Sequence, residues 1–79
     1  MPCSGIDHVA LTVTGLQVSL EFYETVLGVQ SDGRMSDGPF VRHLLPLPDG
    51  SHLGLNQHDA GSGRPFDPTA TGLDHLGLA

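Results

Sequence analysis

The chain has 79 residues and a formal net charge of −6, with nine Asp or Glu against three Arg and no Lys. A nucleic-acid groove or an anionic membrane surface needs clustered cations, so this composition excludes both as partners. Cys3 is the single cysteine, which rules out a disulfide within the chain and favours a reducing, cytoplasmic location. The sequence shows no secretory signal and no apolar run as long as a membrane span.

The first part of the chain predicts a strand followed by a helix. Residues 6–13 are apolar and β-branched between two glycines, as is typical of a strand. Thr14 and Gln17 match a capping box, which predicts the start of a helix, and Gly28 is placed to end it. One apolar stripe of this helix is expected to pack on a sheet. The stripe consists of Leu16, Leu20, Tyr23 and Leu27, widened by Phe22 and Val26.

The rest of the chain predicts further strands. We expect them at residues 29–35, 40–47 and 51–57, separated by turn signals at 36–39 and 48–50. Residues 59–71 are rich in Gly, Ser, Pro and Asp and are expected to form an exposed linker, after which residues 73–79 begin another strand. The order β-α-β-β-β, linker, β predicts an α+β fold with the helix on one face of the sheet.

A repeated phrase carries a histidine in each copy. Residues 5–12 read GIDHVALT and residues 72–79 read GLDHLGLA. Because side chains alternate along a strand, His8 shares a face with Ala10 and Thr12, while the apolar positions between them face the helix. We call the face opposite the helix the cup face. His75 has the same parity in the second copy, beside the small residues Gly77 and Ala79.

Two strand-borne histidines suggest a metal site, since imidazole is the commonest side-chain ligand of transition metals. A complete site needs at least one further ligand, and a carboxylate is the usual one. The strand at 51–57 turns Gly54 and Asn56 to the cup face but offers no carboxylate there. His8 and His75 are preferred as ligands over the other three histidines, which are His43, His52 and His58. Phosphate-binding glycine motifs and nucleophile elbows are absent from the sequence, and Cys3 has no evident base beside it.

Three stretches carry a family resemblance. GIDHVALTVTGLQVSLEFYETVLGV, at residues 5–29, resembles the opening of vicinal oxygen chelate proteins, the superfamily of glyoxalase, extradiol dioxygenase and bleomycin-resistance proteins. LPDGSHLGLNQH resembles its third and fourth strands, and GLDHLGLA resembles the opening of a second module. The resemblance implies a βαβββ module at 1–58, a linker at 59–71 and the first strand of an incomplete second module at 72–79. It marks the chain as a fragment of a two-module protein.

The resemblance also implies a site. His8 and His75 occupy usual positions for ligands of a divalent metal, which would be Fe, Mn, Zn or Ni, and a small vicinal-oxygen substrate would bind over Ala10, Thr12, Gly54 and Asn56. Glyoxalase-like members place a Glu near the position of Gly54, and its absence here counts against a glyoxalase-type site. Dioxygenase-like members take a Glu from the last strand of the second module, so the missing carboxylate would lie in that absent module. The implied function is a dioxygenase- or lyase-like metalloenzyme, for which the sequence assigns no catalytic residue beyond the ligands. The alternatives are a metal-free, resistance-type binding protein and an inactive fragment. The expected assembly is a homodimer, with exchanged modules as one arrangement.

Overall fold

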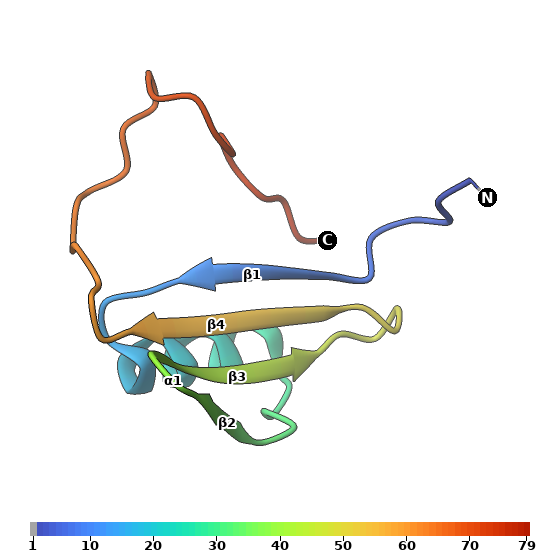
Figure 1. The fold of residues 1–79 in the computed structure, drawn as a ribbon. Coiled ribbons are helices and arrows are strands. Elements are labelled where there is room, and N and C mark those ends of the chain that lie inside the picture. Colours follow the sequence, from blue (N-terminus) through green and yellow to red (C-terminus); the bar gives the residue numbers. More distant parts are fainter. Residues whose placement is uncertain (1) are drawn as a thin grey trace.

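The computed structural model describes residues 2–79 and shows a four-stranded sheet with a helix packed on one face (Figure 1). The elements in chain order are β1 (His8–Thr12), α1 (Leu16–Leu27), β2 (Arg34–Asp37), β3 (Phe40–Pro46) and β4 (His52–His58). This order confirms the predicted βαβββ module. Within the described residues, no helix has the length and apolar character needed to cross a membrane.

The strands lie in the order β1-β4-β3-β2, so that β1 and β2 form the two edges of the sheet. β1 runs parallel to β4, whereas β3 is antiparallel to both of its neighbours. Parallel neighbours need a crossover connection, and α1, β2 and β3 together provide it here. Residues 38 and 39 join β2 to β3 as a two-residue hairpin, within the predicted turn.

The hydrophobic core lies between α1 and the sheet face that it covers. Leu45, Leu53 and Leu55 are 0–1% exposed, and Leu20 joins them from α1 at 7%. Partly buried apolar side chains surround this cluster, namely Val9, Leu11, Val13, Leu16, Tyr23, Leu27 and Val29. The structure therefore confirms the predicted stripe of α1 and the predicted helix-facing side of β1.

The predicted widening of the helix stripe is wrong. Phe22 and Val26 are 59% and 62% exposed, and Val18, one helical turn before Phe22, is 74% exposed. A helix lying on a single sheet face buries only a stripe about 100° wide, and these three residues fall outside it. The Phe22 ring meets Tyr23 edge-on, with the ring centroids 5.1 Å apart.

A residue distant in sequence, rather than the predicted capping box, fixes the start of α1. The helix begins one residue later than the box requires, with Gly15 at the N-cap and Thr14 outside the first turn. The backbone N–H of Leu16 donates to Oε1 of Gln57 on β4, at 2.7 Å. Gln17 does not reach back to Thr14 and instead donates to a glutamate one turn further on. The capping-box prediction is therefore wrong, because a strand side chain accepts the first free N–H of the helix.

This contact predicts an unequal pair of mutants. Gln57→Ala should lower the free energy of unfolding by about 1 kcal/mol, because a partly buried N–H loses its acceptor. Thr14→Ala should change it by less than about 0.5 kcal/mol, as expected for an exposed residue without such a role. Urea denaturation followed by circular dichroism measures both. A larger loss for Thr14→Ala than for Gln57→Ala would reinstate the capping box.

The segment after α1 differs from the predicted strand at 29–35. Gly28 ends the helix as predicted, in the left-handed conformation with φ 68° and ψ 30°. The Ser31 N–H then donates to Glu24, and the Ser31 hydroxyl oxygen accepts from the N–H of Gly33, whose φ is 137°. These local bonds hold the backbone in a turn, so β2 begins only at Arg34.

The turn between β3 and β4 is confirmed at the predicted residues. Asp49 accepts hydrogen bonds from both the hydroxyl and the N–H of Ser51. Both bonds lower the pKa of Asp49, and the bond from the Ser51 hydroxyl has the larger effect. The ionised form is favoured in the folded chain, so this turn loses support when the pH falls through the lowered pKa.

The second copy of the repeat is not a strand in this chain. Residues 59–71 are irregular and exposed and arch away from the sheet, and residues 72–79 return towards β1 (Figure 1). Among the described residues, 72–79 take part in no sheet ladder and no backbone hydrogen bond. The prediction of a strand at 73–79 is wrong for the chain as it stands. A strand forms only when its backbone groups pair with a neighbour, and these eight residues bring no partner with them.

Candidate functional site

The cup face consists of side chains from β1, β3 and β4 arranged in rows across the strands. The register gives four rows. The first is Phe40 and His58, and the second is Arg42, Asn56 and Thr12. The third is Leu44, Gly54 and Ala10, and the fourth is Pro46, His52 and His8. Residues opposite each other in a sheet point to the same side. The predicted common face of His8, Ala10, Thr12, Gly54 and Asn56 is therefore what the register shows. Their roles as metal ligand or substrate contacts stay predictions.

His8 stands at the head of β1 with one ring nitrogen occupied. Its Nδ1 lies 2.8 Å from Oδ2 of Asp7, and its side chain is 61% exposed. An ionised carboxylate only accepts hydrogen bonds, so Nδ1 is the donor in this pair, and in the neutral ring the lone pair lies on Nε2. Carboxylates that orient metal-binding histidines accept from the ring nitrogen that does not bind the metal, in the same geometry. The structure shows Asp7 as the hydrogen-bond partner of His8.

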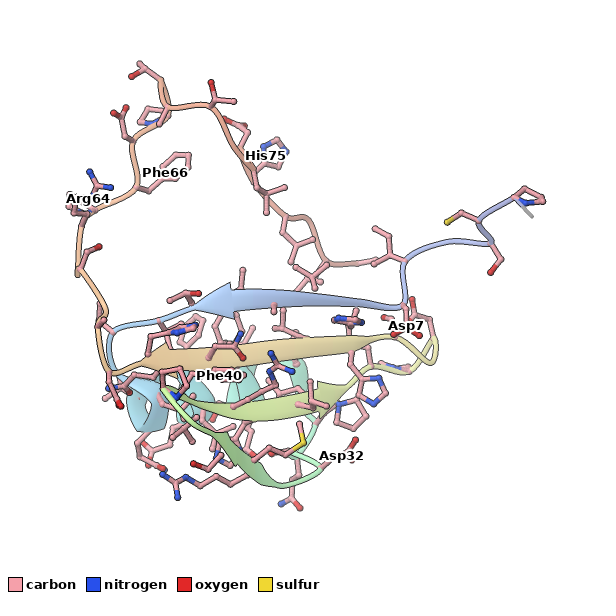
Figure 2. All side chains as sticks on the ribbon, viewed as in Figure 1. Asp7, Asp32, Phe40, Arg64, Phe66 and His75 are labelled. Atoms are coloured by element: carbon pink, nitrogen blue, oxygen red, sulfur yellow. The ribbon has the colours of Figure 1, made fainter. Side chains whose placement is uncertain are left out.

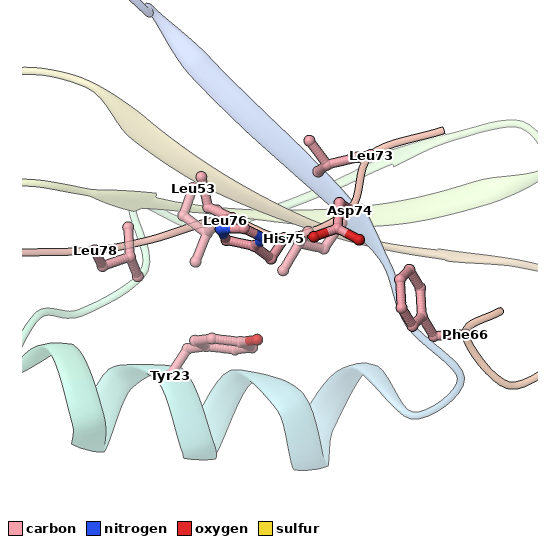
Figure 3. Close-up of a pocket in the computed structure, with 9 residues that line it drawn as sticks. Tyr23, Leu53, Phe66, Leu73, Asp74, His75, Leu76 and Leu78 are labelled. Atoms are coloured by element: carbon pink, nitrogen blue, oxygen red, sulfur yellow. Dashed lines mark hydrogen bonds and ion pairs between the residues drawn. The ribbon is translucent and has the colours of Figure 1, made fainter. Parts of the chain in front are cut away.

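His75 forms the same pair but lies elsewhere. Its Nδ1 is 2.6 Å from Oδ2 of Asp74, and its side chain is 83% exposed. Together with Leu11, Tyr23 and Leu53 it borders a hollow of about 410 Å³ between α1, β1 and the C-terminal residues (Figure 3). These three neighbours belong to the helix side of the sheet. In this chain the two predicted ligands are therefore not brought together, because residues 72–79 do not join the sheet.

His52 is the histidine that the structure places beside His8. The two are direct register partners on the parallel strands β1 and β4. Nε2 of His52 lies 3.3 Å from Oδ2 of Asp32, which leaves its Nδ1 free of that contact. Among the side chains that the structure describes, however, no three His, Cys, Asp or Glu are grouped closely enough to hold a metal ion.

Gly54 occupies the middle of the cup face without a side chain. A Cβ added there would meet Leu44 Cδ2 at 3.4 Å and Ala10 Cβ at 3.5 Å, which are ordinary contact distances. The backbone of Gly54 has no positive φ. A Cβ at this position is therefore sterically possible. Steric crowding does not explain why the chain has no carboxylate here.

The sequence analysis missed Arg42. Its Nε donates to Oδ1 of Asn56 at 2.8 Å, and its Cζ lies 5.0 Å from the centre of the Phe40 ring. Asn56 itself is buried, at 8% exposure, so it is not a solvated strand residue. The alternation of the strand at 40–47 could have placed it. Arg42 lies on the same face as Phe40 and Leu44, and the core residue Leu45 lies on the other face. His43 has the helix-side parity and contacts the Ser31 hydroxyl at 2.6 Å, away from the cup face.

Comparison with known proteins identifies the family. The model of the glyoxalase/bleomycin resistance protein/dioxygenase superfamily matches residues 5–78. A solved glyoxylase/bleomycin resistance protein/dioxygenase domain from Frankia sp. EAN1pec is 35% identical, with a TM-score of 0.85, over 94% of this chain and 55% of that one. Methylmalonyl-CoA epimerase from Mycobacterium tuberculosis shares the fold at 23% identity, with a TM-score of 0.62, over 90% of this chain and 47% of that one. No curated protein matches the chain.

The chain spans about half the length of both solved structures, as expected for a fragment of a two-module protein. The matched region begins at Gly5 and ends at Leu78, so it includes the first copy of the repeat and all but the last residue of the second. The βαβββ order, the cup-facing His8 and the extent of the match agree with one another. The chain belongs to the glyoxalase/bleomycin resistance protein/dioxygenase superfamily.

Proposed function

We propose that this chain is the first module of a divalent-metal-dependent enzyme, dioxygenase- or lyase-like, that acts on a small molecule with two neighbouring oxygen atoms. The observation that carries the proposal is the Asp7–His8 pair on the cup face, in which Nδ1 is held at 2.8 Å and Nε2 is left for a metal. Family membership supports the same reading, because the superfamily includes glyoxalases and dioxygenases.

The residues of this chain fit part of a metal centre. Imidazole nitrogen suits iron, zinc and nickel, whereas manganese favours carboxylate and water oxygens, and His8 offers one imidazole donor on the cup face. His75 is the proposed second ligand. In a complete second module, residues 72–79 would form a strand, and that strand would place His75 on the cup face. The described residues hold no third ligand beside them, so the carboxylate would come from that module. A bound metal would polarise the substrate oxygens as a Lewis acid.

The protein residues have their own tasks in this proposal. Asp7 keeps the His8 ring in one tautomer and orientation, and Asp74 does the same for His75. Ala10, Thr12 and Gly54 leave room above the sheet for a substrate, because their side chains are small or absent. We extend the proposal to a cytoplasmic homodimer in which a second copy supplies the missing half of the cup.

Metal binding by the purified chain tests this function. The chain holds only part of the site, so we expect isothermal titration with Zn²⁺ or Ni²⁺ to show weak binding, which falls at least tenfold in His8→Ala and by a smaller factor in Asp7→Asn, where the ligand is kept but its orienting partner is lost. His58→Ala is the matched control, since His58 is an exposed cup-face histidine three rows away from His8. Metal affinity that is the same in His8→Ala and in the unchanged chain would refute the assignment.

A second candidate function is metal-free binding of a small molecule, as in resistance-type members of the family. The specific observation in its favour is Gly54, which leaves the cup face without the carboxylate that a glyoxalase-type site would use. A chain that binds small molecules on the cup face but no metal would select this candidate over the first.

A further inference from the structure

We propose that Arg42, Asn56 and Phe40 form a subsite for the carboxylate of a flat organic anion, whose body lies over the small residues in the middle of the cup face. This inference rests on the proposed function insofar as it takes the cup face as the ligand-binding surface. It does not depend on a bound metal. It names the class of ligand that this surface would take.

The guanidinium of Arg42 is held in place on two sides. Its Nε donates to Oδ1 of Asn56 at 2.8 Å, and its plane lies near the Phe40 ring, with Cζ 5.0 Å from the centroid. Asn56 is buried and Arg42 is partly buried, so neither is free to swing as a surface side chain would. A guanidinium has five N–H donors, and this arrangement uses the one on Nε. Its terminal Nη groups can therefore meet a carboxylate as a preorganised fork.

The charge of Arg42 is not consumed by its partner. Asn56 is a neutral amide, whereas an Asp at the same position would neutralise the arginine. The ion pairs between described residues all join an aspartate to a histidine, in the pairs Asp7–His8, Asp32–His52 and Asp74–His75. In a chain with a net charge of −6, a partly desolvated arginine held by a neutral amide favours an incoming anion.

The rows beyond Arg42 define the body of the ligand. The next row is Leu44, Gly54 and Ala10, an apolar floor with no side chain at its centre. The row after that contains His8 and His52. Rows are two residues apart, about 6.7 Å, so the Arg42 row lies about 13 Å from the His8 row along the strands. In Figure 2, Phe40 lies towards one end of the sheet and Asp7 at the other.

This spacing describes a molecule with polar groups at both ends. Its carboxylate meets Arg42, a planar apolar middle lies on the floor formed by Leu44, Gly54 and Ala10, and its other end reaches the histidine row. An aromatic carboxylate with oxygen substituents on the far side of the ring has this form. A ligand without a negative charge would leave the Arg42 fork unused.

Nuclear magnetic resonance of the metal-free 79-residue chain tests the subsite with benzoate as the probe and benzamide as its uncharged match. We expect benzoate to shift the signals of the Arg42 Nε–H and of the Asn56 side-chain amide, and benzamide to bind at least tenfold more weakly. Arg42→Gln should weaken benzoate binding at least tenfold, and Arg42→Lys less, because lysine keeps the charge but loses the fork. Asn56→Asp should weaken it as strongly as Arg42→Gln, although Arg42 is still present, because the new carboxylate neutralises it.

The control is Arg34→Gln, which removes the same charge from β2 at a position paired with the helix-side residue His43. It should leave benzoate binding unchanged. Benzoate that binds equally to the unchanged chain and to folded Arg42→Gln or Asn56→Asp would overturn the subsite, as would absence of binding to the folded chain. Because these titrations contain no metal, they fail independently of the metal proposal. Metal binding at His8 without benzoate binding would reject the subsite alone, and the reverse result would reject the metal centre alone.

Discussion

Replacing Leu55 by alanine is expected to leave the chain largely unfolded at room temperature. Leu55 is 0% exposed and is one of four buried apolar residues in the core, as far as the described residues go. Leu→Ala at such a site costs about 2–5 kcal/mol. A domain of this size buries only about 60% of its unfolded surface and has little stability in reserve. The loss should therefore be comparable with the whole free energy of unfolding.

Circular dichroism and amide dispersion in the NMR spectrum measure this outcome. The matched control is Leu73→Ala, which is the same chemical change at a residue that is 66% exposed in the C-terminal segment. It should shift the free energy of unfolding by less than about 0.5 kcal/mol. If Leu55→Ala kept a cooperative transition while Leu73→Ala lost it, the core would lie under the C-terminal segment rather than under α1.

The second large effect is a gain of metal affinity in Gly54→Glu. The substitution puts a carboxylate on the cup face one row from His8 and His52, at a position where a Cβ makes only ordinary contacts. Two imidazoles and one carboxylate are a sufficient set for a divalent transition metal. We expect the affinity for Mn²⁺ or Ni²⁺ to rise at least tenfold, which corresponds to about 1.4 kcal/mol.

Gly54→Gln is the control for this change, because it has the same size and shape but no charge. It should fold as Gly54→Glu does and should gain no metal affinity. The double variant Gly54→Glu with His8→Ala should lose most of the gain. A folded Gly54→Glu chain that binds metal no better than Gly54→Gln would show that His8 and residue 54 cannot share an ion in this chain.

The parts of the fold that follow from local pattern could be predicted from the sequence. The period-2 pattern around His8 separates the helix side of β1 from its cup face, and the register confirms that separation. The spacing of Leu16, Leu20, Tyr23 and Leu27 identifies the packed stripe of α1, and Gly28 identifies its end. These features depend on residues within a few positions of one another, so a sequence pattern suffices.

The features that were missed depend on contacts between distant parts of the chain. The first N–H of α1 donates to Gln57, which lies 41 residues further on, and no local sequence motif predicts this hydrogen bond. The contact between Arg42 and Asn56 follows only from the register of β3 against β4. Phe22 and Val26 are apolar like core residues, but they stay exposed because α1 packs on a single sheet face with its other stripe. The strand at 73–79 fails because it lacks a partner.

The Asp–His contact depends on two adjacent residues and on no particular element of the fold. Asp74 and His75 make their hydrogen bond in a segment without any strand, as Asp7 and His8 do at the start of β1. If both histidines bind metal, as proposed, the same dipeptide would bring its own hydrogen-bond partner to each site, and the rest of the fold would only have to place it.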